Sequence, residues 1–142
     1  MAQYRHRISG PLLDRIDLHV DVPALAFDDL SNRARSESSA SIRSRVMAAR
    51  AIQHQRFAGM DFHCNAHMPP SLIEVHCVLD EESRRIFRRV SEHFGLSARA
   101  YHRVLRMART IADLDNSPGI RSPHLMEAVQ YRVLDRSYQS AA

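Results

Sequence analysis

The fold class is decided by the stretch Leu96-Ser97-Ala98-Arg99-Ala100-Tyr101-His102-Arg103-Val104-Leu105-Arg106-Met107-Ala108-Arg109-Thr110-Ile111-Ala112-Asp113-Leu114. Its apolar residues recur three, four and seven positions apart, which is the pattern of an amphipathic helix with one buried face. Ser97 has the side chain of a helix N-cap, and Leu96 before it can pack against Tyr101 as a hydrophobic staple. The sequence therefore predicts a helix over residues 97–114.

Signals of the same kind lie on both sides of this helix. The sequence predicts a helix over residues 39–57 with an apolar stripe, while its arginines Arg43, Arg50 and Arg56 point elsewhere. The stripe consists of Ile42, Val46, Ala49 and Ile52. Residues 58–70 contain Gly59, Asn65, Pro69 and Pro70 and are expected to be irregular.

Three further helices complete the predicted bundle. One is short and runs from Ser71 to about Cys77, directly after Pro70. The next begins after Asp80 as N-cap and ends at Gly95, and the last begins with Ser122 as cap and Pro123 at its first position. We therefore expect residues 36–142 to form an all-α helical bundle of about four to five helices.

The N-terminal region differs in character from the bundle. The stretch Arg7-Ile8-Ser9-Gly10-Pro11-Leu12-Leu13-Asp14-Arg15-Ile16-Asp17-Leu18-His19-Val20 predicts a helical turn that ends in Arg15 and an extended strand from Ile16 to Val22. This strand has no earlier strand to pair with, and an isolated strand is not stable in water. Residues 23–41 are polar and serine-rich, as in a linker. We expect residues 1–35 to be an orphan strand and linker from a truncated larger protein, and to be poorly ordered.

The composition excludes several classes of function. All 20 basic residues are arginine, so neither a P-loop lysine nor a Schiff-base lysine is present. The net charge of +4 at pH 7 favours an acidic partner such as the phosphates of a nucleotide or of DNA, although arginines on solvated faces would give the same charge. The sequence contains no long apolar run and no signal peptide, and its two cysteines fit a reducing cytosol. We expect a cytoplasmic protein with no membrane partner.

Three arginines of the 97–114 helix form a candidate anion-binding face. Arg99, Arg103 and Arg106 lie almost opposite the apolar stripe. Arg99 is in the first turn, where the helix dipole disfavours a cation, and a bound anion would relieve that mismatch. A solvated arginine face is the alternative explanation.

A second cluster has the residue types of a zinc site. His63, Cys64 and His67 are followed by His76 and Cys77, and histidine and cysteine are the usual zinc ligands. The spacing is not that of a standard zinc knuckle, and Cys77 also fits as a buried thiol. We predict no metal site, and a zinc-stapled interaction domain remains the alternative. No nucleophile motif is present, so this chain alone is not expected to be an enzyme.

Two stretches together resemble one family. The run from Arg7 to Val20 resembles the end of the ATPase core in magnesium-chelatase-like AAA+ proteins, and the run from Leu96 to Leu114 resembles their C-terminal lid. Shorter similarities are Ile42-Arg43-x-Arg45-Val46-x-x-Ala49-Arg50-x-x-Gln53, Asn65-Ala66 and His124-x-x-Glu127-Ala128-Val129-x-Tyr131-Arg132. The chain is most similar to the competence-related branch of the family, the ComM/YifB type.

The resemblance implies roles for two residues. Arg15 matches the arginine finger that acts on the ATP of a neighbouring subunit, and Arg99 matches the sensor-2 arginine that contacts the nucleotide of its own subunit. The helix at 39–57 corresponds to an insertion between core and lid. The Walker A and Walker B motifs are missing, so the resemblance implies that ATP and magnesium are bound in the parent protein and not by this fragment alone.

The same resemblance implies partners for the fragment. They are the AAA+ core of the same chain and neighbouring subunits in a ring oligomer, with DNA as the material on which the parent protein acts in remodelling, uptake or recombination. An independent basic helical module that binds nucleic acid is the alternative function.

Overall fold

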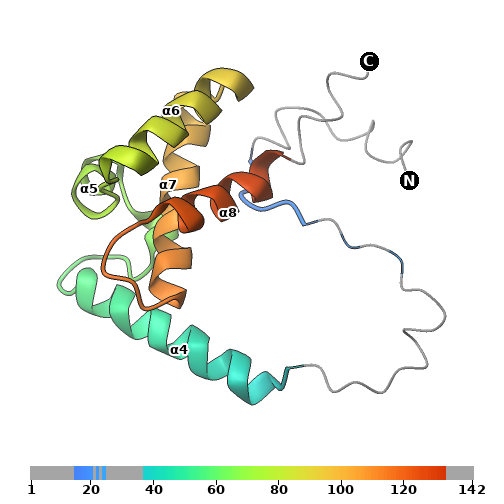
Figure 1. Cartoon of the computed structure of the whole chain (residues 1–142). Helices are drawn as coiled ribbons and strands as arrows, with labels where there is room; N and C mark the ends of the chain where they lie inside the picture. The colour runs from blue at the N-terminus through green and yellow to red at the C-terminus, as the bar shows by residue number, and fades with distance from the viewer. Residues whose placement is uncertain (1–14, 21, 23, 25–36, 134–142) are drawn as a thin grey trace.

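The structure is a computed structural model, and it describes residues 15–20, 22, 24 and 37–133. Within these residues the fold is all-α, as predicted, and contains no strand (Figure 1). In chain order the elements are α4 (Ser39–Arg56), the 3₁₀ helix η1 (Asn65–His67), α5 (Pro70–His76), α6 (Glu81–Phe94), α7 (Ala98–Leu114) and α8 (Ser122–Val133).

Helix α7 is the centre of the bundle. It packs against α4, η1, α5 and α8, and α8 also packs against α6 (Figure 1). Its buried face includes Val104, Ala108 and Ala112, and α8 contributes Leu125 and Ala128 to the same core. The small alanine side chains on both helices allow α7 and α8 to pack closely. Together with α4 and α5, helix α8 buries the apolar face of α7 along most of its length.

The predicted helix ends of α6 and α7 are confirmed. The Asp80 carboxylate accepts a hydrogen bond from the Ser83 backbone N–H at 2.7 Å, and the Ser97 hydroxyl accepts one from the Ala100 N–H at 3.2 Å. Gly95 ends α6 with a φ of 53°, in the left-handed region that glycine adopts without strain. These caps fix where α7 starts, and therefore where Arg99 lies.

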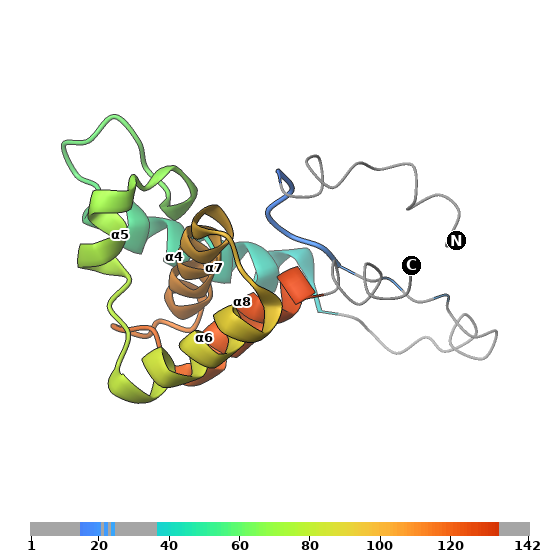
Figure 2. The same ribbon diagram turned by 90° about the horizontal axis from the view of Figure 1, so that it is seen from above.

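Helix α4 departs from the prediction. Of its predicted apolar stripe only Ala49 is buried, while Ile42 and Val46 are 44% and 43% exposed. The cause is that only the C-terminal half of α4 lies against α7, and its N-terminal half projects beyond the bundle (Figures 1 and 2). Residues 58–70, expected to be irregular, contain the single turn η1.

The segment at residues 15–20 also differs from expectation. No strand forms among the described residues of the predicted strand 16–22; instead the segment lies beside the C-terminal end of α8 (Figures 1 and 2). The backbone N–H of His19 donates a hydrogen bond to the Tyr131 carbonyl at 3.0 Å. Because the described residues contain no strand beside this segment, the His19 N–H pairs with a carbonyl at the helix end instead. Residues 1–14 and most of the predicted linker lie outside the described residues.

Candidate functional site

Arg99 lies at the start of the central helix and faces solvent. Ser97 caps this end of α7, and no acidic residue occurs in its first turn. Within residues 37–133, the Arg99 side chain makes no hydrogen bond or ion pair. A cation at the positive end of a helix dipole, with free backbone N–H groups beside it, is an arrangement that favours an anionic ligand.

The other two arginines of the predicted face have different environments. The Arg103 Nε lies 3.1 Å from the Asp17 carboxylate, and the Arg103 side chain is only 16% exposed. Arg106 is half-buried, and its Nε has no hydrogen-bond partner in the described part of the chain. On this face Arg99 is therefore exposed to solvent, Arg103 is paired with the N-terminal segment, and Arg106 is half-buried.

Arg15 is exposed at the start of the described N-terminal segment. The residues that follow it are anchored to the bundle, since the Arg132 guanidinium donates a hydrogen bond to the Ile16 carbonyl and Asp17 pairs with Arg103. The structure thus places the chain that carries Arg15 against the helix that carries Arg99. Neither the sequence pattern nor the predicted strand indicated this contact.

A buried charge network that the sequence did not reveal lies at the other end of α7. The Asp113 carboxylate accepts hydrogen bonds from Arg56 at 2.6 and 2.7 Å, from the Asn65 amide at 2.8 Å and from Arg109 at 3.1 Å. Arg109 also donates to the carbonyls of Ser117 and Pro118. The prediction that Arg56 points away from the packed face is wrong, because its guanidinium has to reach the buried Asp113.

Asp113 remains a carboxylate although its side chain is fully buried. Burial raises its pKa, but the hydrogen bonds from Arg56 and Asn65 and the charges of Arg109 and Arg56 outweigh that effect and lower the pKa below its ordinary value. The network ties the end of α4, η1 and the turn after α7 together. The spacing of Arg109 and Asp113, four residues apart on one helix, is the one local signal that could have indicated it.

The histidine and cysteine residues do not form a metal site in the described residues. No three side chains of histidine, cysteine, aspartate or glutamate come together there in a way that could hold a metal. Cys64 Sγ lies 3.6 Å from His67 Nδ1, His63 stacks on His54, and His76 contacts the Phe57 ring. Cys77 is a buried thiol, and burial raises its pKa to about 11.

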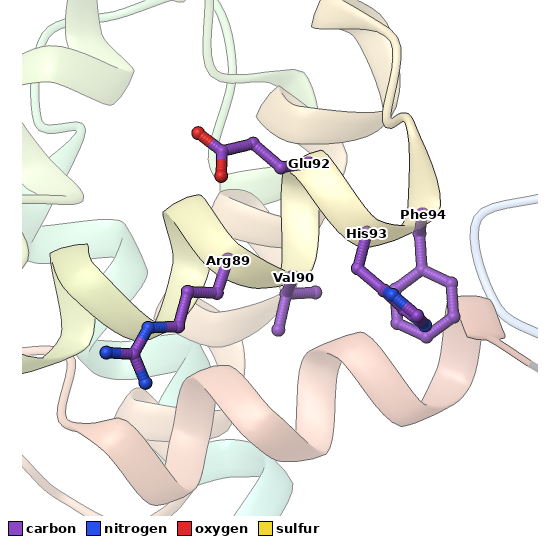
Figure 3. Close-up of a pocket in the computed structure, with 5 residues that line it drawn as sticks. All are labelled: Arg89, Val90, Glu92, His93 and Phe94. Atoms are coloured by element: carbon purple, nitrogen blue, oxygen red, sulfur yellow. The ribbon is translucent and has the colours of Figure 1, made fainter.

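A shallow hollow on α6 offers no convergent chemistry. Figure 3 shows its lining residues Arg89, Val90, Glu92, His93 and Phe94, all of which come from one helix. A binding site normally gathers polar groups from several elements. We therefore do not take this hollow as a candidate site. The candidate site consists of Arg15, Arg99 and the contacts between their two segments.

Comparison with known proteins agrees with the sequence resemblance. Residues 36–132 match the family described as magnesium chelatase, subunit ChlI C-terminal, and residues 1–30 match the family described as magnesium chelatase, subunit ChlI. The competence protein ComM of Haemophilus influenzae is 41% identical over 140 residues, which is 98% of this chain and 27% of that protein.

Two further relatives extend this picture. The uncharacterized protein YifB of Salmonella typhimurium is 41% identical over 135 residues, which is 94% of this chain and 26% of that protein. An uncharacterized protein of Mycobacterium tuberculosis is 35% identical over 120 residues, or 83% of this chain and 24% of that protein. The chain spans about a quarter of the length of these relatives. None of the described helices is both long enough and apolar enough to span a membrane.

Proposed function

This chain belongs to the magnesium-chelatase-like family of the ComM/YifB type, and from that membership we propose that its helical bundle is the lid of an AAA+ ATPase. In this proposal Arg99 contacts the phosphates of a nucleotide bound to its own subunit. Arg15 contacts the nucleotide of a neighbouring subunit in a ring. In the same proposal the part of the AAA+ core that binds ATP lies outside these 142 residues, and the parent protein acts on DNA in the cytoplasm.

The position of Arg99 is the observation on which the proposal mainly rests. Arg99 stands in the first turn of α7, exposed and without an ion pair in the described region, where the dipole and the free N–H groups favour phosphate. Arg15 is exposed as well, and a guanidinium that is always charged suits an arginine finger because it neutralises charge on the transferred phosphoryl group. The match of residues 1–30 to the chelatase subunit itself supports the assignment of Arg15.

The chain's own residues fit only part of an ATP site. Arg99 and Arg15 provide two cationic contacts to phosphate, whereas the sequence has no lysine for a P-loop. Among residues 15–20 and 37–133 no carboxylate cluster could hold magnesium. In the proposal, magnesium and the P-loop lysine therefore belong to the core, and magnesium supplies charge neutralisation of the phosphates there.

The test is a chimera in which this chain replaces the matching region of the Haemophilus ComM protein. We expect Arg15→Ala to lower the rate of ATP hydrolysis by a factor of about 10³, the lower range for loss of an arginine finger, with ATP affinity within about twofold of the unmutated chimera. We expect Arg99→Ala to weaken nucleotide binding, measured with a fluorescent ATP analogue. Arg89→Ala, on the exposed face of α6, is the matched control. Unchanged turnover and affinity in both variants would overturn the proposal.

A second function, binding of a nucleic-acid backbone, is favoured by one feature of α4. This helix has no acidic residue in 18, and Arg43 and Arg50 lie seven residues apart on one exposed side. Neither makes an ion pair in the described part of the chain, whereas Arg45 pairs with Glu37 at 2.7 Å. An unneutralised basic helix that projects from its bundle is suited to contact phosphates.

Binding of a fluorescent DNA duplex to the 142-residue chain tests this second function. If α4 is the contact, the double variant R43E and R50E should weaken binding at least tenfold and flatten its dependence on salt. The double variant R85E and R89E on α6 imposes the same change of charge elsewhere. Equal loss in both double variants would show a response to net charge alone and would remove α4 as the binding site.

A further inference from the structure

Contacts of three residues in the described segment 15–20 fasten it to the lid helices. The Arg132 guanidinium donates to the Ile16 carbonyl, the Asp17 carboxylate pairs with Arg103 Nε at 3.1 Å, and the His19 N–H donates to the Tyr131 carbonyl at 3.0 Å. Two of these contacts reach α8 and one reaches α7. Three of the four residues 16–19, namely Ile16, Asp17 and His19, are thereby held on the two helices.

The side chains on the lid are fixed more firmly than those on the segment. Arg132 is 7% exposed and the Arg103 side chain is 16% exposed, whereas Asp17 is 66% exposed. Because their side chains are largely buried, the guanidinium groups of Arg103 and Arg132 are restricted to few rotamers. They therefore form a fixed binding surface, to which the exposed Asp17 side chain and its backbone adjust. The position of the segment therefore follows the position of α7 and α8.

The Asp17–Arg103 pair connects the segment that carries Arg15 to the helix that carries Arg99. Asp17 is two residues after Arg15, and Arg103 is one helical turn after Arg99 on the same face of α7. One helical turn moves as a unit, so a shift of the first turn of α7 on binding of phosphate to Arg99 would also shift Arg103. Through the ion pair the displacement reaches Asp17 and the backbone that carries Arg15.

We propose that Asp17 and Arg103 are positioning residues that couple the nucleotide contact of Arg99 to the placement of the arginine finger Arg15. This inference rests on the proposed function of the two arginines. In a ring, the position of Arg15 toward the neighbouring subunit would therefore depend on whether nucleotide is bound at Arg99 of its own subunit.

The first experiment uses the ComM chimera. We expect Asp17→Asn, which removes the charge and keeps the shape, to lower kcat about fivefold and to bring the Hill coefficient for ATP close to 1, with KM within about twofold. A fivefold change corresponds to about 1 kcal/mol, the upper range for an ion pair with one exposed partner. Asp61→Asn, at an exposed aspartate of the loop after α4, is the control, and thermal unfolding confirms that both variants fold.

A double-mutant cycle distinguishes coupling from simple loss of stability. If Asp17 acts through Arg103 and Arg99, then Asp17→Asn should have no further effect on kcat in an Arg103→Gln or an Arg99→Ala background. Additive effects in both backgrounds would overturn the inference. A Hill coefficient and a kcat of Asp17→Asn equal to those of the unmutated chimera would also overturn the inference.

The outcomes also separate this inference from the proposed function. If Arg15→Ala and Arg99→Ala leave turnover and affinity unchanged, the proposed function itself fails. If those variants are impaired and Asp17→Asn is not, only the coupling fails. The ion pair has its own readout in the 142-residue chain, because the NMR signal of the Arg103 Nε–H should shift in Asp17→Asn; an unmoved signal contradicts the pair.

Discussion

At the scale of single residues, Asp113 is the group on which the buried charges of the bundle depend. It neutralises Arg56 and Arg109, whose side chains are 12% and 3% exposed. Replacing this carboxylate by a neutral amide would leave two guanidinium groups sheltered from water without a counter-charge. Removal of one partner from a buried ion pair costs far more than removal of an exposed one.

We expect Asp113→Asn to lower the free energy of unfolding by about 3 kcal/mol or more. Urea denaturation followed by circular dichroism measures this change. Asp61→Asn, at an exposed aspartate, should stay within about 0.5 kcal/mol of the unmutated chain. Equal stability of the two variants would mean that the network contributes nothing to folding.

Asp113 also makes the stability of the bundle depend on pH. Although burial raises the Asp113 pKa, the hydrogen bonds from Arg56 and Asn65 and the neighbouring guanidinium charges hold it below its unfolded value of 3.8. Its contribution to stability is therefore complete above pH 3.8 and is lost as the pH falls below 3.8 through the folded-state pKa. Unfolding free energies measured from about pH 6 to about pH 2 should decline more steeply for the unmutated chain than for Asp113→Asn. Parallel curves would contradict the assignment.

Cys77 and Cys64 should differ sharply in thiol reactivity. Only the thiolate reacts, and a pKa of about 11 leaves Cys77 almost entirely protonated at about pH 8 in addition to being buried. We expect Ellman's reagent to modify one thiol per native chain quickly and the second only on unfolding. Cys64→Ser should abolish the fast phase; a fast phase that persists would show that Cys77 is accessible.

At the scale of elements, α7 and α4 illustrate two kinds of amphipathic helix. The apolar stripe of α7 is covered along most of its length because α4, α5 and α8 surround it. In α4 only Ala49 and Gln53 are buried, both in its C-terminal half, and the first half of the helix is exposed on every side. A helix without tertiary contacts gains little from propensity alone.

Amide hydrogen exchange should separate these two regions. We expect residues 42–48 of α4 to exchange much faster than residues 104–112 of α7, because they can open without disrupting the core. Exchange of the 142-residue chain followed by NMR or mass spectrometry gives the comparison. Equal protection of both stretches would mean that another surface covers the N-terminal half of α4.

At the scale of the whole molecule, the bundle positions Arg99 at its surface and anchors the segment that carries Arg15. The core and the Asp113 network stabilise α7, the caps place its first turn, and the segment at residues 15–20 is anchored to α7 and α8. In the proposed function Arg99 and Arg15 contact phosphate, and the sequence has no lysine for a P-loop. On that proposal the chain completes a nucleotide site rather than forming one.

We accordingly expect the 142-residue chain alone to release no phosphate from ATP above background. The ComM chimera, assayed in the same way, serves as the positive control. Phosphate release by the isolated chain that disappears in Arg99→Ala would contradict this expectation and would indicate a complete site within the chain.

The sequence by itself determined the helices, because their signals are local. Ser97, Asp80 and Gly95 act within one turn of their own positions, and the apolar spacing of residues 104–112 defines a buried face without reference to any partner. Tyr101, the first residue of the predicted stripe, is 38% exposed. The same local reasoning placed Arg99 at the exposed start of its helix.

Only the tertiary structure decided what lies far apart in the chain. Arg56 meets Asp113 across 57 residues and Arg132 meets Ile16 across 116, and no periodicity encodes such pairs. The exposure of Ile42 and Val46 likewise depends on where α7 ends beside α4, not on their spacing. Whether a side chain is buried, paired or free is set by the elements that surround it, and their arrangement follows from packing of the whole chain.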